Sequence, residues 1–379
     1  MKILVLGAGL VGAPMARDLA VEDTFEITVV DRDPEALARL LSLAPVATRI
    51  DDLSDTARIK DLAAGHDLVL SAVPGFMGYR TLQAVIETGT DIVDIAFFAE
   101  DPFALDELAR EMGVTAVVDC GVFPGMGSAL VMHAARQLDE VDTVLTYVGG
   151  LPQTRTWPWE YKAVFSPIDV IEEYVRPARY VENGAPVTRS ALSDPELLDF
   201  PGVGTLEAFN TDGLRTLART IDAPNMKEKT LRYPGHIEKM RLLRECGFFS
   251  PEAIDVGGQR VSPLDVTAAL LFPMWKLAEG EGDLTVMQIN VEGRQGGQLQ
   301  RHVFDLLDHY DPDTDVTSMA RTTGYTATTT IRLMAAGLYK HTGISPPEYL
   351  GKDPACIEFL LKGLSERGVR YNQRVQDLD

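Results

Sequence analysis

The sequence predicts an α/β fold: a doubly wound parallel sheet, followed by an α+β domain with a mixed sheet. Three observations lead to this prediction. Short apolar runs alternate with helix-like segments over the first third of the chain, a glycine-rich turn follows the first run, and the alternation stops near Pro124. Such alternation is typical of a parallel sheet with helices on both faces. We therefore expect one domain over residues 1–124 and a second over residues 125–339, with residues from about 340 to 379 packing back on the first.

The predicted strands of the first domain are short, rich in Val, Ile and Leu, and bounded by turn residues, which is the pattern of buried parallel strands. They span residues 2–6, 26–30, 67–73, 91–95 and 114–119, and a further apolar stretch precedes Asp51. Apolar residues at helical spacing predict helices between these strands, over residues 34–41, 56–64, 81–88 and 104–112.

The second domain is expected to follow a different rule, because its strands are not separated by crossover helices. A loop-rich region with four prolines lies between residues 152 and 177. The predicted strands span residues 141–147, 229–233, 284–291 and 299–305. The predicted helices span residues 128–137, 237–246, 263–278 and 317–338. Strands in such an order indicate a mixed or antiparallel sheet.

Length and hydrophobicity describe an ordinary globular protein. The 379 residues are 45% hydrophobic and 24% charged, which suits two folded domains. No apolar run approaches the ~20 residues that span a bilayer. The apolar N-terminal stretch breaks at Gly7 and no cleavage site follows it. We therefore expect a cytoplasmic protein that does not enter a membrane.

Charge and cysteine content exclude several further classes of function. The formal net charge of −21 argues against nucleic acid and against an anionic membrane surface, because both bind a basic face. We interpret the acidic excess as solvation, with adaptation to a salty cytoplasm as an open alternative. Cys120, Cys246 and Cys356 lie far apart without metal-ligand spacing, so we expect neither a metal site nor a disulfide framework.

A glycine-rich motif, Gly7-Ala8-Gly9-Leu10-Val11-Gly12, directly follows the first strand and opens a helix. In a dinucleotide-binding turn, Gly7 permits the tight turn, Gly9 the approach of the pyrophosphate, and Gly12 the close packing of the helix on the strand. Leu10 and Val11 lie in the same turn, where the free N–H groups of the helix start meet the phosphates. The motif therefore predicts a Rossmann domain.

The acidic residue expected on the adenosine ribose is Asp31, which ends the second strand about 20 residues after the glycines. A carboxylate there accepts hydrogen bonds from both ribose hydroxyls and repels a 2′-phosphate, so NAD is favoured over NADP. Arg32 is the reservation, because a neighbouring guanidinium can pair with a phosphate. The alternative for Asp31 is a turn or cap residue before Pro34.

Further cofactor contacts are expected at the carboxyl ends of the other strands, where the crevice of such a sheet lies. Small residues and a Pro-Gly turn after the fourth strand would let the cofactor lie against the backbone. Asp51 and Asp52 follow the third apolar stretch and either contact the adenine or form a solvated turn. The remaining candidates are Ala72, Val73, Pro74 and Gly121.

Several segments outside the glycine motif resemble the saccharopine dehydrogenase-like family, and within it the lysine 6-dehydrogenases most. The resemblance covers nearly the whole chain and rests on residues 119–126, 147–152, 160–166, 206–209, 230–236 and 319–323. In relatives that form or cleave saccharopine, the turn at residues 122–125 carries an Asp that touches substrate, and an Arg lies near residues 209–212. Phe123 and Thr211 stand in those two places here, which implies a substrate other than saccharopine.

The resemblance implies oxidation of the terminal amine of lysine: NAD takes a hydride from the ε-carbon, and water hydrolyses the imine. Arg232 is our candidate for the substrate α-carboxylate, because a guanidinium binds it in a bidentate manner; an ordinary strand-end ion pair is the alternative. His236 is our candidate for relaying the amine proton, against a histidine hydrogen-bonded to backbone. Glu160, Tyr161 and Asp119 are weaker candidates.

Two other functions stay open at this point. One is a reductive enzyme of the same family that joins an amine to an aldehyde or keto acid, as carboxynorspermidine enzymes do. The other, from another class, is a redox sensor that binds NAD without turnover. In each case we expect a small-molecule amine or amino acid rather than nucleic acid or membrane, and the resemblance implies a homodimer formed through the second domain.

Overall fold

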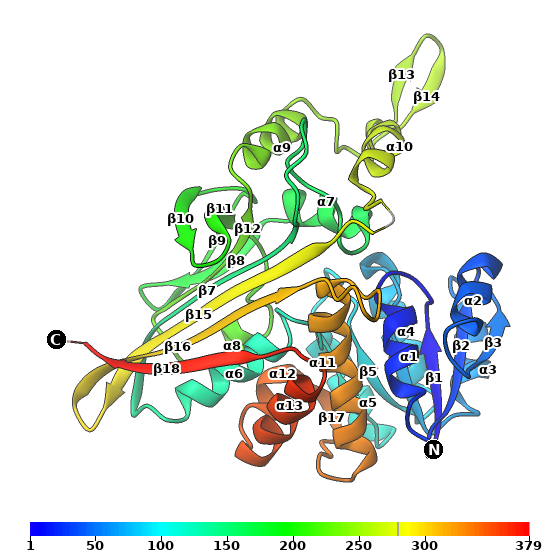
Figure 1. Ribbon diagram of the computed structural model, residues 1–379, viewed down its shortest axis with the longest axis horizontal. Coiled ribbons are helices and arrows are strands. Elements are labelled where there is room, and N and C mark those ends of the chain that lie inside the picture. The colour runs from blue at the N-terminus through cyan, green and yellow to red at the C-terminus, as the bar shows by residue number, and fades with distance from the viewer. Residues whose placement is uncertain (279, 379) are drawn as a thin grey trace. The chain divides into compact units, whose positions relative to one another are not determined.

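The computed structural model describes residues 1–278 and 280–378 and divides into two compact units, each made of two stretches of the chain (Figure 1). Unit 1 comprises Met1–Gln137 and Met319–Tyr371. Unit 2 comprises Leu138–Ser318 and the C-terminal residues from Asn372. The division therefore lies later than Pro124, and the return to the first unit begins earlier than residue 340. The reason is that the helices at 126–135 and 318–335 bury most of their surface within unit 1.

Unit 1 is built on a seven-stranded parallel sheet, which confirms the predicted Rossmann architecture. Side chains on both faces are buried, as the apolar runs predicted. In spatial order the strands are β17 (Gly343–Ser345), β6 (Thr115–Val117), β5 (Asp91–Asp94), β4 (Leu68–Ser71), β1 (Lys2–Leu6), β2 (Glu26–Asp31) and β3 (Ala47–Ile50).

The helices of unit 1 connect these strands and cover the sheet. The N-terminal ones are α1 (Gly12–Leu19), α2 (Pro34–Leu41), α3 (Thr56–Ala63), α4 (Gly75–Ile86), the short 3-10 helix η1 (Pro102–Leu105) with α5 (Asp106–Glu111), and α6 (Met126–Ala135). The helix expected to begin at residue 81 begins at Gly75, because Pro74 ends the strand and starts the helix without breaking it. The helix expected over residues 104–112 is split at Asp106.

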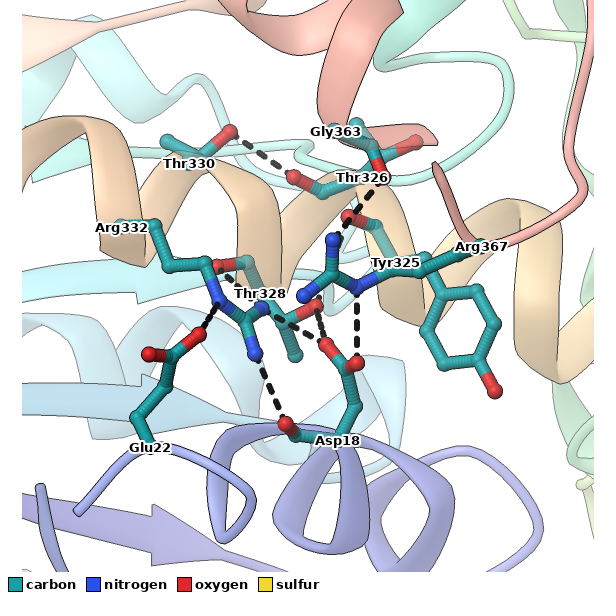
Figure 2. A network of polar contacts seen from close by, with 9 residues as sticks. All are labelled: Asp18, Glu22, Tyr325, Thr326, Thr328, Thr330, Arg332, Gly363 and Arg367. Carbon is teal, nitrogen blue, oxygen red and sulfur yellow. Dashed lines mark hydrogen bonds and ion pairs between the residues drawn. The ribbon is translucent and has the colours of Figure 1, made fainter. Parts of the chain in front are cut away.

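The C-terminal part of unit 1 comprises α11 (Ser318–Ala335), β17, α12 (Pro347–Leu350) and α13 (Pro354–Glu366). It is tied to α1 through the carboxylate of Asp18 (Figure 2). Asp18 accepts hydrogen bonds from Arg367 Nε at 2.7 Å, from Arg332 Nη1 at 2.7 Å and from the Thr328 hydroxyl. Arg332 Nε also pairs with Glu22 at 2.9 Å. One carboxylate on the dinucleotide-binding helix thus holds both α11 and the end of α13.

Unit 2 is built on a nine-stranded mixed sheet, which confirms the second part of the predicted fold class. The pair β12–β7 is parallel, and the pairs β10–β11, β11–β12, β7–β15 and β15–β16 are antiparallel. The path runs β10 (Glu196–Phe200), β11 (Gly204–Asn210), β12 (Asn225–Arg232), β7 (Glu140–Pro152), β15 (Asp283–Gln295), β16 (Gln298–His309) and β18 (Tyr371–Asp377), with β8 (Ala178–Glu182) on β12 and β9 (Ala185–Arg189) on β8.

Strand β7 continues well beyond Tyr147, where the sequence predicts its end. It passes through Gly149-Gly150 because the backbone of β12 approaches closely there: a Cβ on Gly149 would lie 2.6 Å from the carbonyl oxygen of Leu231. The glycine pair therefore serves close strand packing rather than a turn.

Three helices of unit 2 pack together around a buried apolar cluster that includes Phe209 of β11: α7 (Pro167–Val175), α9 (His236–Glu245) and α10 (Pro263–Trp275). The short helix α8 (Leu217–Thr220) lies between β11 and β12 in the sequence. Helix α7 lies in the stretch expected to be loop-rich, because Pro167 occupies the first helical position, where it starts a helix. The hairpin of β13 (Ile254–Val256) and β14 (Gln259–Val261) precedes α10 and extends away from the sheet (Figure 1). Among the described residues, no helix combines the length and apolarity needed to cross a membrane.

Candidate functional site

The glycine turn has the geometry that a dinucleotide pyrophosphate requires. Gly7 has a φ of 102°, and a Cβ there would lie 2.8 Å from the Ala72 carbonyl oxygen. A Cβ on Gly12 would lie 2.2 Å from the Gly7 carbonyl oxygen, so α1 packs too closely for any side chain. Gly9 is exposed and would meet no atom within 4 Å, which leaves open space beside its backbone. Leu10 is exposed, and Val11 lies immediately before α1.

The strand order places this turn at the switch point of the sheet. Strands β1 and β4 are neighbours, and the connections that leave their carboxyl ends go in opposite directions. Ligands of doubly wound sheets bind in the crevice at such a point. Ala72, Val73 and Pro74 follow β4 there, and the Ala72 N–H donates to the Leu6 carbonyl oxygen at 2.8 Å. The structure thus brings the glycines and the residues after β4 together.

Asp31 ends β2 and fixes the glycine turn through its carboxylate. Its Oδ2 accepts from the Ala8 N–H at 2.6 Å, and its Oδ1 accepts from the Asp33 N–H at 2.9 Å. The side chain is partly exposed, so its remaining lone pairs face outward beside the turn. Arg32 is exposed next to it. This is the position at which a ribose diol is held in Rossmann domains.

The two aspartates after β3 differ in their surroundings. The Asp51 N–H donates to the Asp31 carbonyl oxygen at 3.2 Å, and its carboxylate pairs with Arg49 at 2.8 Å. Asp52 is exposed and accepts from the Ser54 N–H at 2.9 Å, a hydrogen bond that lowers the pKa of its carboxyl. Asp51 thus lies next to the ribose position, whereas Asp52 forms a solvated turn.

The turn after β6 is tight. Asp119 is buried with a φ of 51°, and Gly125 has a φ of 142° with no room for a Cβ beside Gly121. Phe123 lies half-buried at the apex, before Pro124. A Cβ on Gly121 would contact the methyl group of Thr323 in α11 at 3.3 Å.

Helix α11 also packs on the start of α1, a relationship that sequence reasoning missed. A Cβ on Gly324 would lie 2.8 Å from Met15 and 3.4 Å from Val11. The first turns of α11 therefore lie between the pyrophosphate turn and the turn at residues 121–125. The available signal was the glycine within a predicted helix, which indicates close packing.

A second group of candidate residues lies in unit 2, around Arg232 at the end of β12. Its guanidinium is buried, with Nη2 2.8 Å from Glu173 Oε2, Nε 3.1 Å from the Tyr174 hydroxyl, and Nη1 3.0 Å from the Leu231 carbonyl oxygen. The Tyr161 ring covers it, with the guanidinium carbon 4.7 Å from the ring centroid. Arg232 thus forms the buried ion pair weighed above as the alternative to substrate binding.

His236 begins α9 beneath this guanidinium and is fully buried. Its Nδ1 lies 2.7 Å from the Trp159 carbonyl oxygen, and its Nε2 lies 2.9 Å from the Tyr174 hydroxyl. These partners assign the proton to Nδ1, and Nε2 accepts from Tyr174. Burial and the Arg232 charge lower the pKa of His236 to about 3, and burial raises the pKa of Tyr174 to about 12. In this arrangement the imidazole is neutral, and both of its nitrogens are engaged.

The weaker candidates lie apart from one another. Tyr161 is buried, with its ring centroid 4.8 Å from that of His236 and 5.5 Å from that of Trp275. Glu160 has a φ of 53°, and its largely buried side chain pairs with Arg155 at 3.2 Å. The structure thus brings Tyr161, Arg232 and His236 together and leaves Glu160 outside that group.

Thr211 belongs to a separate buried group centred on Glu228, which sequence reasoning missed. The Thr211 hydroxyl donates to Glu228 Oε2 at 2.6 Å, and the Gly213 N–H donates to the same oxygen at 3.1 Å. Thr230 lies 2.7 Å from Thr211, oxygen to oxygen. Burial raises the pKa of the Glu228 carboxyl to about 8. Glu228, Thr230 and Arg232 alternate along β12 and therefore point to the same face of the sheet.

Family comparisons divide the chain at nearly the same place as the change in sequence pattern. The saccharopine dehydrogenase NADP binding domain matches residues 3–117, and the saccharopine dehydrogenase C-terminal domain matches residues 121–369. The chain belongs to the saccharopine dehydrogenase family. Its N-terminal part matches the nicotinamide-dinucleotide-binding domain of this family and has the Rossmann architecture.

Relatives of this saccharopine dehydrogenase-family protein have several names. Carboxyaminopropylagmatine dehydrogenase of Synechocystis sp. is 25% identical and covers 99% of this chain and 98% of its own length. Carboxynorspermidine synthase of Vibrio cholerae is 24% identical over 93% of each chain. The α-aminoadipic semialdehyde synthase of Bos taurus is 26% identical over 69% of this chain, which spans only 30% of that longer protein. The apo structure of the L-Glu-forming saccharopine dehydrogenase of Saccharomyces cerevisiae covers 99% of both chains with a TM-score of 0.80 and 19% identity, which supports the fold.

Glu173, Tyr174 and Glu228 are the residues of this family member that the sequence did not reveal. The first two lie in α7, within a stretch interpreted as loops, and Glu228 stands between two lysines in β12. The available signal was the alternation Glu228, Thr230, Arg232, which places three polar side chains on one face of a strand. Nothing in the sequence indicated that this face is the buried one.

Proposed function

We propose that this protein oxidises the ε-amine of L-lysine, or the terminal amine of a related ω-amino acid, with NAD as the oxidant. The observation that carries the proposal is the environment of Thr211. Where saccharopine-acting relatives have an Arg, the Thr211 hydroxyl donates to the buried carboxyl group of Glu228. A buried carboxyl group with uncharged partners accepts a hydrogen bond from an amine and, because it brings no cation, disfavours a second substrate carboxylate. Phe123, half-buried where those relatives have an Asp, acts in the same direction.

Arg232 is the residue we propose for the substrate α-carboxylate. Its guanidinium is held in place on several sides by Glu173, Tyr174 and the ring of Tyr161, so it is already oriented before substrate arrives. The Glu173 carboxylate binds Nη2 of the Arg232 guanidinium, as a substrate carboxylate would, and burial raises the pKa of the Glu173 carboxyl. A substrate carboxylate would replace Glu173 or share the guanidinium with it. His236, engaged on both nitrogens, then orients Tyr174 and does not itself act as the base.

NAD rather than NADP is proposed from the position of Asp31. A carboxylate at the end of β2 accepts hydrogen bonds from ribose hydroxyls and repels a 2′-phosphate. The matched family domain is described as NADP binding, so this preference is a property we propose for this chain. When bound, the nicotinamide supplies the hydride acceptor, and the residues of the chain position the amine and remove its proton.

A second candidate function is formation or cleavage of a secondary amine, as the names of the full-length relatives suggest. Carboxyaminopropylagmatine dehydrogenase matches over 99% of this chain and 98% of its own length. The same residues would then hold an amine that condenses with an aldehyde or keto acid. Under this alternative the reduced cofactor is consumed when both partners are supplied together.

The experiment that tests the proposal is a screen with purified protein, both nicotinamide cofactors, and lysine, ornithine, cadaverine and simple alkylamines. Absorbance at ~340 nm reports the reduced cofactor. We expect an increase with lysine and NAD at alkaline pH. Oxidation of reduced cofactor only when an amine and an aldehyde or keto acid are present would favour the second candidate. Binding of NAD without turnover of any amine would instead indicate a redox sensor.

We also propose that unit 2 forms a homodimer through helix α10. This helix has an apolar stripe on its solvent side, with Val266, Leu270 and Met274 exposed at helical spacing, adjacent to the buried stripe of Thr267, Leu271 and Trp275. Among its 13 residues only Asp265 is charged. With a net charge of −21, a contact on an uncharged surface avoids repulsion between two copies, and an apolar stripe is complementary to itself.

A further inference from the structure

We propose that Glu228 is a neutral acid at neutral pH and that, once deprotonated at alkaline pH, it takes a proton from the substrate ammonium through the hydroxyl of Thr211. The proposal rests on the proposed amine oxidation for the identity of the proton donor. Its first half, that Glu228 is a neutral carboxylic acid, stands on the geometry of unit 2 alone. It assigns a role to a residue that lies outside the group around Arg232.

The groups around Glu228 supply hydrogen bonds but no cation. The Thr211 hydroxyl donates to Glu228 Oε2 at 2.6 Å, and the Gly213 N–H donates to the same oxygen at 3.1 Å. Each threonine hydroxyl has a single proton to donate, so the 2.7 Å contact between Thr211 and Thr230 uses the proton of Thr230. The 3.5 Å approach of the Thr230 hydroxyl to Glu228 Oε1 is therefore a weak contact. A buried carboxyl with neutral partners only is more stable as the neutral acid.

The charges that face Glu228 also favour the neutral form. Glu173 on α7 and Asp212 in the loop after β11 are negative and raise the pKa of its carboxyl, although burial is the larger cause. Asp212 is itself held by Arg179 in a bidentate pair, at 2.8 and 2.7 Å, and Arg232 on the same strand is held by Glu173. Among the described residues, the groups within hydrogen-bond distance of the Glu228 oxygens are all uncharged.

A further buried hydroxyl, that of Thr146, lies next to Glu228 and supports a role of these residues in proton transfer. Thr146 lies directly across from Glu228 in the parallel pair β7–β12, so both side chains point to the same face. Thr146 is fully buried, and its hydroxyl has no hydrogen-bond partner within the described ranges 1–278 and 280–378. Buried polar groups of native proteins are almost always paired, so an unpaired hydroxyl here points to a group or a water that joins these residues.

The proton transfer balances as follows. Above the pKa of Glu228, its carboxylate takes one proton from the substrate ammonium by way of Thr211, which accepts one proton and gives up its own. The substrate becomes a neutral amine and Glu228 a neutral acid. Loss of hydride from the amine-bearing carbon to the oxidised nicotinamide cofactor, which the proposed activity supplies, then leaves an iminium ion. Glu228 afterwards returns its proton to solvent, so the net products are the iminium, the reduced cofactor and one proton.

The first test asks whether Glu228 holds a proton, and it requires no substrate. Infrared spectra of the wild-type protein and of Glu228→Gln are compared between about pH 6 and about pH 10. We expect a carboxylic-acid carbonyl band in the wild type that disappears with a midpoint near pH 8 and is absent from Glu228→Gln. The matched control is Glu182→Gln. Glu182 lies on β8, is half exposed, and pairs with Lys227, the neighbour of Glu228 on β12. Loss of the band in the control variant, or its absence from the wild type, would overturn the proposal.

The second test uses the pH dependence of turnover with the amine that the screen identifies. Removing a general base lowers kcat by roughly 10²- to 10⁴-fold, so we expect such a loss in Glu228→Gln, together with loss of the limb near pH 8 from the profile of kcat/KM. Thr211→Val, which keeps the volume and removes the relay, should lower kcat with the infrared band retained. Unchanged pH profiles in both variants would refute the proton exchange. If no amine is oxidised at all, the proposed function fails, and the infrared band still decides the protonation of Glu228.

Discussion

The hydroxyl of Tyr174 lies 2.9 Å from Nε2 of His236 and 3.1 Å from Nε of Arg232, so one phenol joins the buried guanidinium to the buried imidazole. The hydrogen bonds run in one direction, from Arg232 to Tyr174, from Tyr174 to His236, and from His236 to the carbonyl oxygen of Trp159. Every donor in this chain has an acceptor. The chain fixes the tautomer of His236 and holds the guanidinium at the end of β12.

Substitution of Arg232 should separate its structural role, the ion pair with Glu173, from its proposed role in binding the substrate carboxylate. Arg232→Ala leaves the buried carboxylate of Glu173 without its cation, which costs about 3–5 kcal/mol in the free energy of unfolding. The double variant Arg232→Met/Glu173→Gln removes both charges and should be more stable than Arg232→Ala. If Arg232 also binds the substrate carboxylate, the double variant raises the KM for lysine far more than the KM for an alkylamine, as steady-state kinetics would measure. Equal changes in the two KM values would remove Arg232 from substrate binding.

The buried, neutral His236 predicts a loss of stability in acid. Burial lowers the pKa of His236 in the folded state to about 3, whereas the unfolded residue takes up a proton near its ordinary pKa of 6.5. Below about pH 6.5 the unfolded state therefore binds more protons, and stability falls by up to roughly 1.4 kcal/mol per pH unit until the folded state also protonates. Chemical denaturation of wild type and His236→Asn from about pH 8 to about pH 4 should show their difference shrinking as pH falls. The exposed His309→Asn is the control, and a constant difference would contradict the prediction.

Asp31 predicts the choice of cofactor. Asp31→Ala should weaken NAD binding far more than NADP binding, because the variant loses the ribose partner and, for NADP, also loses the repulsion of the 2′-phosphate. Isothermal titration with each cofactor would measure both dissociation constants. The variant also loses the acceptor of the Ala8 N–H, so its melting temperature is measured in parallel. An unchanged affinity for NAD would show that the ribose does not lie at the end of β2.

The glycine turn and the end of β2 are where the sequence predicted most of the structure. Gly7, Gly9 and Asp31 have their places through backbone conformation and through a position at the end of a strand, and both leave local signals in the sequence. The parallel sheet of unit 1 was predicted from the alternation of apolar runs and helical segments, whereas β17 was not among the predicted strands. The Glu228 group differs, because burial of Glu228 depends on β7, β11 and α7, which come from distant parts of the chain. Helix α7 was not predicted, because the prolines of that stretch indicated loops, although Pro167 in fact begins the helix.

The apolar stripe of α10 predicts dissociation of the proposed dimer by a single charge. Leu270 is 66% exposed in the isolated chain, and Leu270→Asp would bury a carboxylate at the contact. Analytical ultracentrifugation should find the wild type as a dimer and the variant as a monomer. Leu197→Asp on β10, where the leucine is 62% exposed, is the matched control and should remain a dimer. A monomeric wild type, or a dimeric Leu270→Asp, would contradict this interface.

The central claim is that a hydride passes from the ε-carbon of lysine to NAD, and deuterium labelling tests it directly. The protein is supplied with NAD and L-lysine that carries deuterium on the ε-carbon, and the reduced cofactor is analysed by mass spectrometry. We predict that the reduced cofactor contains one deuterium for each lysine oxidised, since the cofactor accepts the hydride directly from that carbon. Reduced cofactor without deuterium, or no reduction of NAD in the presence of lysine, would contradict the account.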